Sequence, residues 1–419
     1  MHAALNRQRT DRVPIWFWYH PETTRRLAGV LGIPPPLVAD ALGDDIRQTW
    51  VGNNNAMEGI LHDREGEGHT DPWGIRWVRQ GGFNQVETSP LADAGEKEIL
   101  QYEFPYGRTE ELLSTMDAVL TSPGGRFIGC DISPCLLELM FRVRGMEGAL
   151  LDIAASPETS RAFLNKAADF SIHLAREACA RFPLDWLWTG DDVGSQRSMI
   201  ISPQRWRDMI GPQLARIFSA GKSAGVLVAY HSCGSIRPII PDLIAMGLDV
   251  LNPIQYNCPG MDPVELKREF GKRLSFMGGL DTQHLLPEGR PEEVFRATKE
   301  LIDVMTDDGG GYILAASHTV PPETPLDNIF AMYRAAGVTR QQIQDNAADI
   351  RAGGGKAVIT RAGRMSLLHK LHPPVFPLPL FCVVGSDGRQ GANPVRSQSR
   401  SGDAVSSRQR LDDRFGPCL

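Results

Sequence analysis

The sequence predicts an α/β fold, a single (β/α)8 barrel of the TIM type, on three observations. Short apolar runs bounded by turn residues recur eight times, and the stretches between them are long enough for helices. Many of these stretches have a helical period, and this alternation is typical of parallel βα units. Because 42% of the 419 residues are hydrophobic, the chain can bury the core of one such barrel.

The expected strands follow one another along the first three quarters of the chain. They lie at 13–18, 46–51, 126–131, 184–189, 226–231, 249–252, 274–278 and 312–316. The clearest helices are expected at 157–181, 203–224, 237–246 and 291–305. Ser202 precedes Pro203 as a capping residue before a proline at the first helical position.

Two regions depart from this alternation. Residues 53–98 are rich in Gly, Asn and charge, which predicts an insertion or irregular hairpins with a turn at 71–74. After residue 339 the chain becomes glycine-rich, then proline-dense, then rich in Ser and Arg. We therefore expect a barrel domain at 1–339 and a low-complexity, disordered tail at 340–419, as a genuine extension or as an altered reading frame at the end of the gene.

Charge and composition limit the classes of function. The net charge of -6 and the pI near 6.0 argue against a nucleic-acid-binding surface or a polybasic membrane patch, so a small-molecule substrate is expected. No run approaches the roughly 18 apolar residues of a membrane span, and residues 1–11 lack the core of a signal peptide. We expect a cytoplasmic protein whose seven cysteines, without any CxxC pair, are buried thiols or metal ligands.

His231 and Cys233 form the first candidate for chemistry. They end an expected strand, and residues two apart on an extended chain project to the same side, so an imidazole and a thiolate would converge there. Barrel enzymes keep their reactive groups at this end of the strands, and Gly234 allows the sharp turn that follows. The spacing predicts half of a zinc site, although a hydrogen-bonded histidine beside an inert thiol explains it equally well.

A third ligand would make this pair a catalytic zinc site, in which three protein ligands leave one position open. His318 is the preferred candidate because it follows the eighth expected strand and arrives at the same end of the barrel. Residues on neighbouring loops offer alternatives, namely Cys258, Asp281 and His284.

Further polar residues at the ends of strands are expected to line one pocket. They are Asp191, Asp192, Asn252, Gln255 and Asp281. Asp281 could equally cap the helix that follows the seventh strand. The aromatic residues of the first strand, Trp16, Trp18 and Tyr19, are interpreted as core.

Linked motifs give the chain a family resemblance. HSCGSIRPIIPDLIAMGLDVLNPIQ, FMGGLDTQHLLPEGRPEEV and GGYILAASHTVPPETPLDNIFAMY occur in this order and resemble the uroporphyrinogen decarboxylase superfamily, and RVPIWFWYHPE and DPWGIRW fit as well. The resemblance covers about residues 10–338. It implies a (β/α)8 barrel and one of two chemistries, cofactor-free decarboxylation or zinc-dependent, corrinoid-linked methyl transfer.

The motifs weigh these chemistries against each other. The decarboxylases carry Arg-Gln-Ala-Gly-Arg soon after the first strand, where this chain has Trp-Phe-Trp-Tyr-His-Pro-Glu-Thr, and Arg25 and Arg26 lie further on. The methyltransferases place His-x-Cys at the end of the fifth strand as zinc ligands, matched here by His231 and Cys233. Their third ligand is a cysteine of the last loop; His318 stands there, where the decarboxylases keep a histidine for substrate contact.

The resemblance therefore implies methyl transfer from methylcobalamin or a corrinoid-binding protein to a thiol or similar acceptor, with Zn²⁺ at the site. Roles in this chemistry are expected for catalytic Asp192, Asp281 and His318 and for cofactor-binding Gln196, Asn252 and Gln255. Two alternatives stay open, uroporphyrinogen III decarboxylation in porphyrin biosynthesis and a corrinoid- or porphyrin-binding barrel without turnover.

Overall fold

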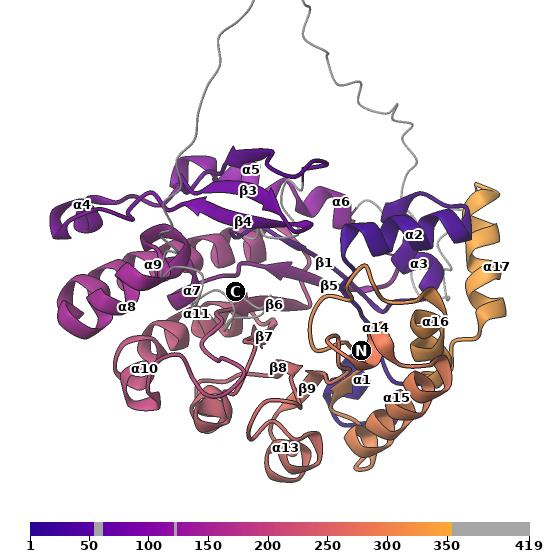
Figure 1. Cartoon of the computed structure of the whole chain (residues 1–419). Helices are drawn as coiled ribbons and strands as arrows, with labels where there is room; N and C mark the ends of the chain where they lie inside the picture. The colour runs from indigo at the N-terminus through magenta and orange to yellow at the C-terminus, as the bar shows by residue number, and fades with distance from the viewer. Residues whose placement is uncertain (54–61, 121–123, 354–419) are drawn as a thin grey trace, which may run out of the picture. The chain divides into compact units, whose positions relative to one another are not determined.

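The computed structural model describes residues 1–53, 62–120 and 124–353, and in them the predicted barrel is confirmed (Figure 1). Seven parallel strands are hydrogen-bonded in the order of the sequence. They are β1 (Ile46–Trp50), β5 (Phe127–Asp131), β6 (Trp186–Gly190), β7 (Leu227–His231), β8 (Val250–Ile254), β9 (Ser275–Gly278) and β10 (Tyr312–Ile313). Their positions agree with the expected strands to within two or three residues at each end.

The extended segment 13–19 forms the eighth part of the barrel wall. The Trp16 amide donates to the Leu314 carbonyl at 3.0 Å, which joins the segment to the chain beside β10. On the other side, the Asp45 amide donates to the Ile15 carbonyl at 2.9 Å and the Asp45 carboxylate accepts the Ile15 amide at 2.8 Å. The segment therefore bridges the two edges of the seven-stranded sheet, although its pairing is too sparse to make a regular strand.

Helices surround the strands. They are α2 (Pro21–Leu31), α3 (Val38–Leu42), α7 (Leu137–Arg144), α8 (Met146–Ala155), α9 (Pro157–Arg181), α10 (Pro203–Met209), α11 (Gly211–Ser223), α12 (Ile240–Ala245), α13 (Pro263–Phe270), α14 (Leu285–Glu288), α15 (Pro291–Thr306) and α16 (Leu326–Ala335). The helix expected at 203–224 is divided at Ile210 into α10 and α11. The Ser202 hydroxyl accepts the Arg205 amide at 3.1 Å, which confirms the predicted cap. No described helix has both the length and the apolar character needed to cross a membrane.

The interior of the barrel is aromatic. Side chains alternate between the outer layer, which packs on the helices, and an inner cluster to which Trp16, Trp186 and Trp188 belong. The Trp186 indole of β6 donates to the Gln48 side chain of β1 at 2.7 Å, over the intervening strand β5. Gly129 makes room for this contact, because a Cβ there would lie only 2.1 Å from Trp186 Nε1.

The expected N-terminal insertion is present and contains a small antiparallel sheet. Its strands are β2 (Gly68–Thr70), β3 (Arg76–Gln80) and β4 (Phe83–Thr88). The expected turn at 71–74 is present, and the Asp71 carboxylate holds it by accepting the Trp73 and Ile75 amides at 2.9 and 3.0 Å. Short helices complete the region before β5, namely α4 (Glu96–Gln101), α5 (Thr109–Leu113) and α6 (Met116–Leu120).

Helix α17 (Arg340–Arg351) lies beyond the boundary expected at residue 339 and nevertheless belongs to the compact unit of the barrel. Thr339 and Gln342 form a capping box at its start, and Asn346 donates to the Ala41 carbonyl at 3.1 Å. Only Ile343 and Ala347 of this helix are buried, so its sequence looks like the polar tail. The remaining tail residues, 354–419, lie outside the described residues.

A buried polar chain ties the first segment to α16 and to the start of β1. Tyr19 donates to the Tyr333 hydroxyl at 3.0 Å, and Tyr333 donates to the Asp44 carboxylate at 2.5 Å. The other carboxylate oxygen of Asp44 has no hydrogen-bond partner among the described residues. Burial raises the pKa of Asp44 to about 7, although the Tyr333 hydrogen bond and nearby Arg47 lower it in part.

We predict that Asp44 makes the stability of the barrel depend on pH. Because its pKa is higher in the folded than in the unfolded protein, the free energy of unfolding should fall as pH rises from about 4 to about 7, by about 1.4 kcal/mol per unit of pKa difference at most. Asp44→Asn removes the titrating group, so its free energy of unfolding should not show this decrease. The difference in the free energy of unfolding between the variant and the wild type should therefore shift in favour of the variant as pH rises. Urea unfolding of both proteins at pH 5 and pH 8 checks it, and an equal difference at the two pH values would contradict it.

Candidate metal centre

Three side-chain atoms that could hold a metal ion come together at the C-terminal end of the barrel strands. His231 is the last residue of β7, and Cys233 follows two residues later on the same side of the chain. The Cys233 sulfur lies 3.5 Å from His231 Nε2. His318, in the loop after β10, brings its imidazole to the same place, and the three ligand atoms all lie within 4.8 Å of one another.

Asn252 orients the His231 ring. The two residues are paired across β7 and β8, and His231 Nδ1 lies 2.6 Å from the Asn252 side-chain oxygen. The Asn252 amide nitrogen donates to the Met277 carbonyl at 3.4 Å, so its oxygen faces the imidazole. Because this oxygen can only accept a hydrogen bond, the neutral His231 ring carries its proton on Nδ1. Nε2 is then unprotonated, and its lone pair is on the side of Cys233.

Burial keeps both imidazoles neutral, which is the form that binds a metal. It lowers the pKa of His231, with the Asn252 hydrogen bond acting in the opposite direction. It also lowers the pKa of His318 to about 4, and the neighbouring His231 adds to this decrease.

Asp192 lies directly against the two ligands on 231–233. Its carboxylate accepts the Cys233 amide at 2.8 Å, and the same oxygen lies 3.5 Å from His231 Nε2. Burial and then the nearby Glu138 carboxylate raise the pKa of Asp192 to about 8. Of the polar strand-end residues that the sequence singled out, Asp192 and Asn252 therefore reach the three-donor cluster.

Asp191 turns away from the cluster. Its carboxylate accepts the amides of Leu136, Leu137 and Glu138 at 3.2, 2.8 and 2.7 Å, at the start of α7. An acceptor placed at the N-terminus of a helix satisfies amides that have no partner within the helix. Asp191 therefore anchors α7 to the end of β6.

Other predicted residues support loops around the cluster. Gln255 accepts the Gly234 amide at 2.8 Å, and Gly234 has the positive φ of 82° that its turn requires. Gln196 accepts from the Cys258 thiol at 3.4 Å. Neither contact includes a ligand atom of the cluster.

Asp281 supports the turn that leads into α14, whose N-cap residue is His284. The Asp281 carboxylate accepts the Gln283 amide at 2.7 Å and the Leu285 amide at 3.4 Å, at the start of α14. His284 is 73% exposed and faces Glu288. Among the alternatives for a third ligand, neither of these two residues belongs to the three-donor cluster.

Tryptophans surround the cluster, including one that sequence analysis assigned to the core alone. The Trp18 ring lies 5.5 Å from the His231 ring and 6.5 Å from the His318 ring, between centroids. The indole nitrogens of Trp18 and Trp188 are buried without a hydrogen-bond partner among the described residues. Trp18 also lines an open cavity of about 590 Å³, whose wall includes Trp16, Trp50 and Gln48.

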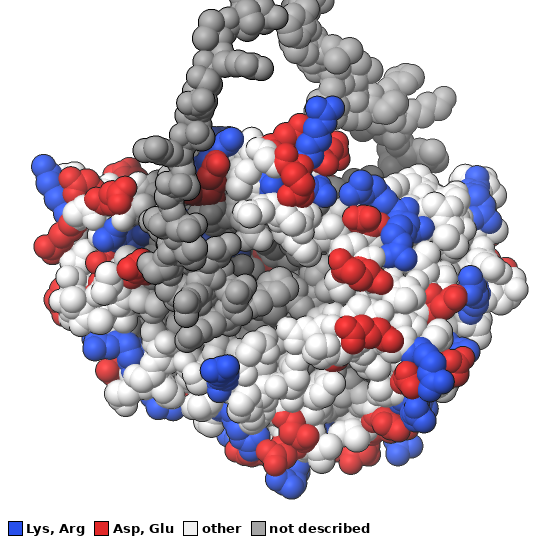
Figure 2. Space-filling model, in the orientation of Figure 1, with Lys and Arg blue, Asp and Glu red and all other residues white. Residues whose placement is uncertain are grey.

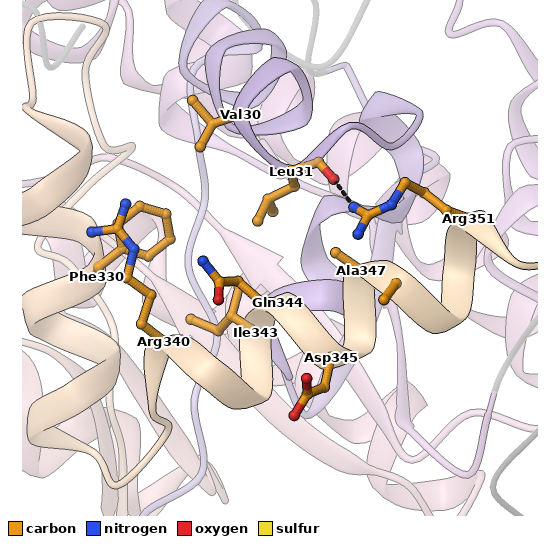
Figure 3. Close-up of a pocket in the computed structure, with 10 residues that line it drawn as sticks. Val30, Leu31, Phe330, Arg340, Ile343, Gln344, Asp345, Ala347 and Arg351 are labelled. Carbon is orange, nitrogen blue, oxygen red and sulfur yellow. Dashed lines mark hydrogen bonds between the residues drawn. The ribbon is translucent and has the colours of Figure 1, made fainter.

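A second cavity, of about 390 Å³, lies outside the barrel between α2, α16 and α17. Figure 3 shows Leu31, Ile343 and Ala347 along it, with Arg351 hydrogen-bonded to the Leu31 carbonyl. None of the three residues of the candidate metal centre lines it. On the face of the molecule in Figure 2, acidic and basic side chains alternate instead of gathering into a patch of one sign.

Comparison with known families adds an independent observation. The sequence matches the uroporphyrinogen decarboxylase (URO-D) family over residues 96–337, which is more than half of the chain. The chain belongs to the URO-D family. The matched region contains His231, Cys233 and His318, so the cluster lies within the family's own part of the barrel.

The relatives of this URO-D family member include both chemistries. A methylated-thiol–coenzyme M methyltransferase of Methanosarcina mazei is 27% identical over 211 residues, which are 50% of this chain and 52% of the relative. A uroporphyrinogen decarboxylase of Thermus thermophilus is 29% identical over 134 residues, 31% of this chain and 35% of the relative. The chain thus matches about half or less of the length of these relatives.

A solved structure supports the fold. A methyltransferase from Methanosarcina mazei superimposes with a TM-score of 0.58 at 18% identity, covering 80% of this chain and 96% of the other. The sequence matches to methyltransferases agree with the methyltransferase-like branch that the motifs indicated, and the superposition supports the barrel fold.

We predict that Asp281 acts through the α14 turn and not through the metal centre. Asp281→Ala leaves two amides without their acceptor and should lower the free energy of unfolding by about 1 kcal/mol. The stoichiometry of bound zinc should stay at the wild-type value. Chemical denaturation and metal analysis of the purified variant check both expectations, and a loss of metal would contradict them.

Proposed function

We propose that this URO-D family member catalyses zinc-dependent methyl transfer from a methyl-corrinoid to a thiol or a similar acceptor. The observation that carries the proposal is the convergence of His231 Nε2, Cys233 Sγ and a His318 nitrogen within 4.8 Å of one another. The curated methyltransferase relatives support it at the level of the family branch.

The donor set fits zinc. Zinc binds imidazole nitrogen at about 2.0 Å and thiolate sulfur at about 2.3 Å in a tetrahedron, which needs ligand atoms about as close together as these three. Both imidazoles are neutral, and Asn252 holds Nδ1 of His231 as a donor so that Nε2 is free. Three protein ligands leave a fourth position, as in catalytic zinc sites.

Zinc bound there would favour the deprotonated form of a thiol acceptor. The chain's own residues would do the remaining work. Asp192 holds the Cys233 peptide, Gln255 holds the turn at Gly234, and the tryptophans exclude water from the inner side of the cluster. The cavity that Trp18 lines offers space for an acceptor.

The decisive experiment pairs metal content with methyl transfer. Purified wild-type protein should bind one zinc per chain and demethylate methylcobalamin with coenzyme M as the thiol. Cys233→Ala removes the thiolate ligand and should lower both the zinc content and the rate, the rate by more than about 100-fold. Cys258→Ala is the matched control, because Cys258 is also buried but contacts Gln196 and lies outside the cluster.

The alternative reaction is tested with the same preparations. The Thermus thermophilus relative and the histidine at position 318 favour decarboxylation of uroporphyrinogen III as the second candidate. Formation of coproporphyrinogen by metal-free wild-type protein, together with an inactive methyl-transfer assay, would overturn the proposal in favour of this reaction. Binding of methylcobalamin or a porphyrin without any product would instead favour a barrel without turnover.

We predict that Asn252 controls zinc affinity without touching the metal. Asn252→Leu removes the acceptor for His231 Nδ1 and should weaken zinc binding about 10- to 100-fold. Asn252→Asp keeps an oxygen at this position and should retain most of the affinity. Competition with a chromophoric chelator measures both variants; equal affinity in wild type and Asn252→Leu would show that the ring is oriented by other contacts.

A further inference from the structure

A buried polar chain leads from the small β2–β3–β4 sheet toward the metal centre. It begins at Asp71, whose carboxylate accepts from the Trp77 indole at 2.7 Å and from the Asn53 side chain at 2.6 Å. Arg142, on the last turn of α7, donates to the backbone carbonyl of Asn53 and, at 3.3 Å, to its side-chain oxygen. The Arg142 guanidinium also lies 5.5 Å from the centre of the Trp77 ring.

The chain continues through Glu138 to the ligand-bearing strand. Arg142 donates to the Glu138 carboxylate at 2.5 Å, one turn earlier on the same helix. The second oxygen of Glu138 accepts the Asp192 amide at 3.3 Å, and the Asp192 carboxylate in turn accepts the Cys233 amide. Each step is a hydrogen bond, so a displacement of α7 would be passed on to the Cys233 peptide.

The Arg142–Glu138 pair is costly to maintain if stability is its only purpose. The two side chains are 14% and 18% exposed, and taking such charges out of water cancels much of their attraction. Arg142 nevertheless contacts Glu138 and Asn53 together, which the planar guanidinium with its several donors does better than a lysine. This geometry defines the position of α7 relative to both the small sheet and the loop after β6.

We propose that Arg142 and Glu138 are positioning residues of the metal centre, which fix Asp192 and hence Cys233 against the β2–β3–β4 sheet. The inference rests on the proposed function, because it assigns the small sheet a role in shaping a metal site. It gives the N-terminal insertion a purpose beyond covering the barrel.

Arg144 provides a matched control two residues away. It lies on the same helix, is 13% exposed, and pairs with Asp152 at 2.8 Å. It donates to the carbonyls of Leu91 and Ala92, as Arg142 does to Asn53. None of these partners contacts the metal centre, so Arg144→Gln removes a comparable buried pair without touching the polar chain.

The experiment compares Arg142→Gln with Arg144→Gln in the full-length protein. Arg142→Gln should weaken zinc binding about 10- to 100-fold and change the absorption bands of the Co²⁺-substituted protein, while Arg144→Gln keeps wild-type values for both. Arg142→Lys should recover part of the lost zinc affinity, because lysine retains the positive charge but lacks the planar guanidinium with its several donors. Equal zinc affinities and Co²⁺ spectra in the Arg142 and Arg144 variants would overturn the inference.

A metal-free measurement separates this inference from the proposed function. The rate at which iodoacetamide alkylates Cys233, followed by mass spectrometry, should rise in Arg142→Gln and not in Arg144→Gln. If the wild type binds neither zinc nor Co²⁺, the proposed function fails. A faster alkylation of Cys233 in Arg142→Gln than in Arg144→Gln would still support the positioning role. Equal alkylation rates in the two variants would overturn the positioning role. Glu138→Gln is the second variant if Arg142→Gln does not fold, and unchanged Cys233 alkylation in it also overturns the inference.

Discussion

The hydrogen bond between His231 Nδ1 and the Asn252 side chain is the contact on which the geometry of the candidate metal centre depends. It exists because β7 and β8 are neighbours in parallel register, which places residues 231 and 252 side by side at the end of the strands. The Asn252 amide is itself held by the Met277 carbonyl on β9. The pairing of β7, β8 and β9 therefore fixes which imidazole nitrogen of His231 faces Cys233, independently of any bound metal.

Central strands of the barrel were predictable because both of their faces are buried. All five residues of β5, β6 and β8 are buried, so each appears in the sequence as a short, mostly apolar segment between turn residues. Helix α17 has the opposite character. Only two of its residues are buried, Ile343 and Ala347, and its Asn346 side chain reaches a backbone carbonyl of α3; neither feature has a periodic signal strong enough to detect.

The ends of strands could be located from the sequence, but the partners of their polar residues could not. Asp191, Gln255 and Asp281 all lie where a pocket residue would lie, yet each satisfies backbone amides of a neighbouring loop. A buried amide without an acceptor costs free energy, so polar side chains at these positions accept hydrogen bonds from backbone amides instead of facing the pocket. In the sequence, Glu138 and Arg142 are recognisable only as an oppositely charged i, i+4 pair in an apolar helix. Their other partners, Asp192 and Asn53, lie 54 and 89 residues away along the chain and could not be identified from the sequence.

A histidine as the third ligand, in place of a second thiolate, has an electrostatic consequence for the proposed chemistry. One thiolate and two neutral imidazoles carry a single negative charge against the two positive charges of zinc, so such a site would keep a net charge of about +1. The surrounding Trp18 and Trp188 rings form a wall of low polarity in which this charge is poorly screened. An acceptor that becomes anionic on losing its proton is favoured in such surroundings over one that stays neutral, and this preference is stronger than in a site that already holds two thiolates.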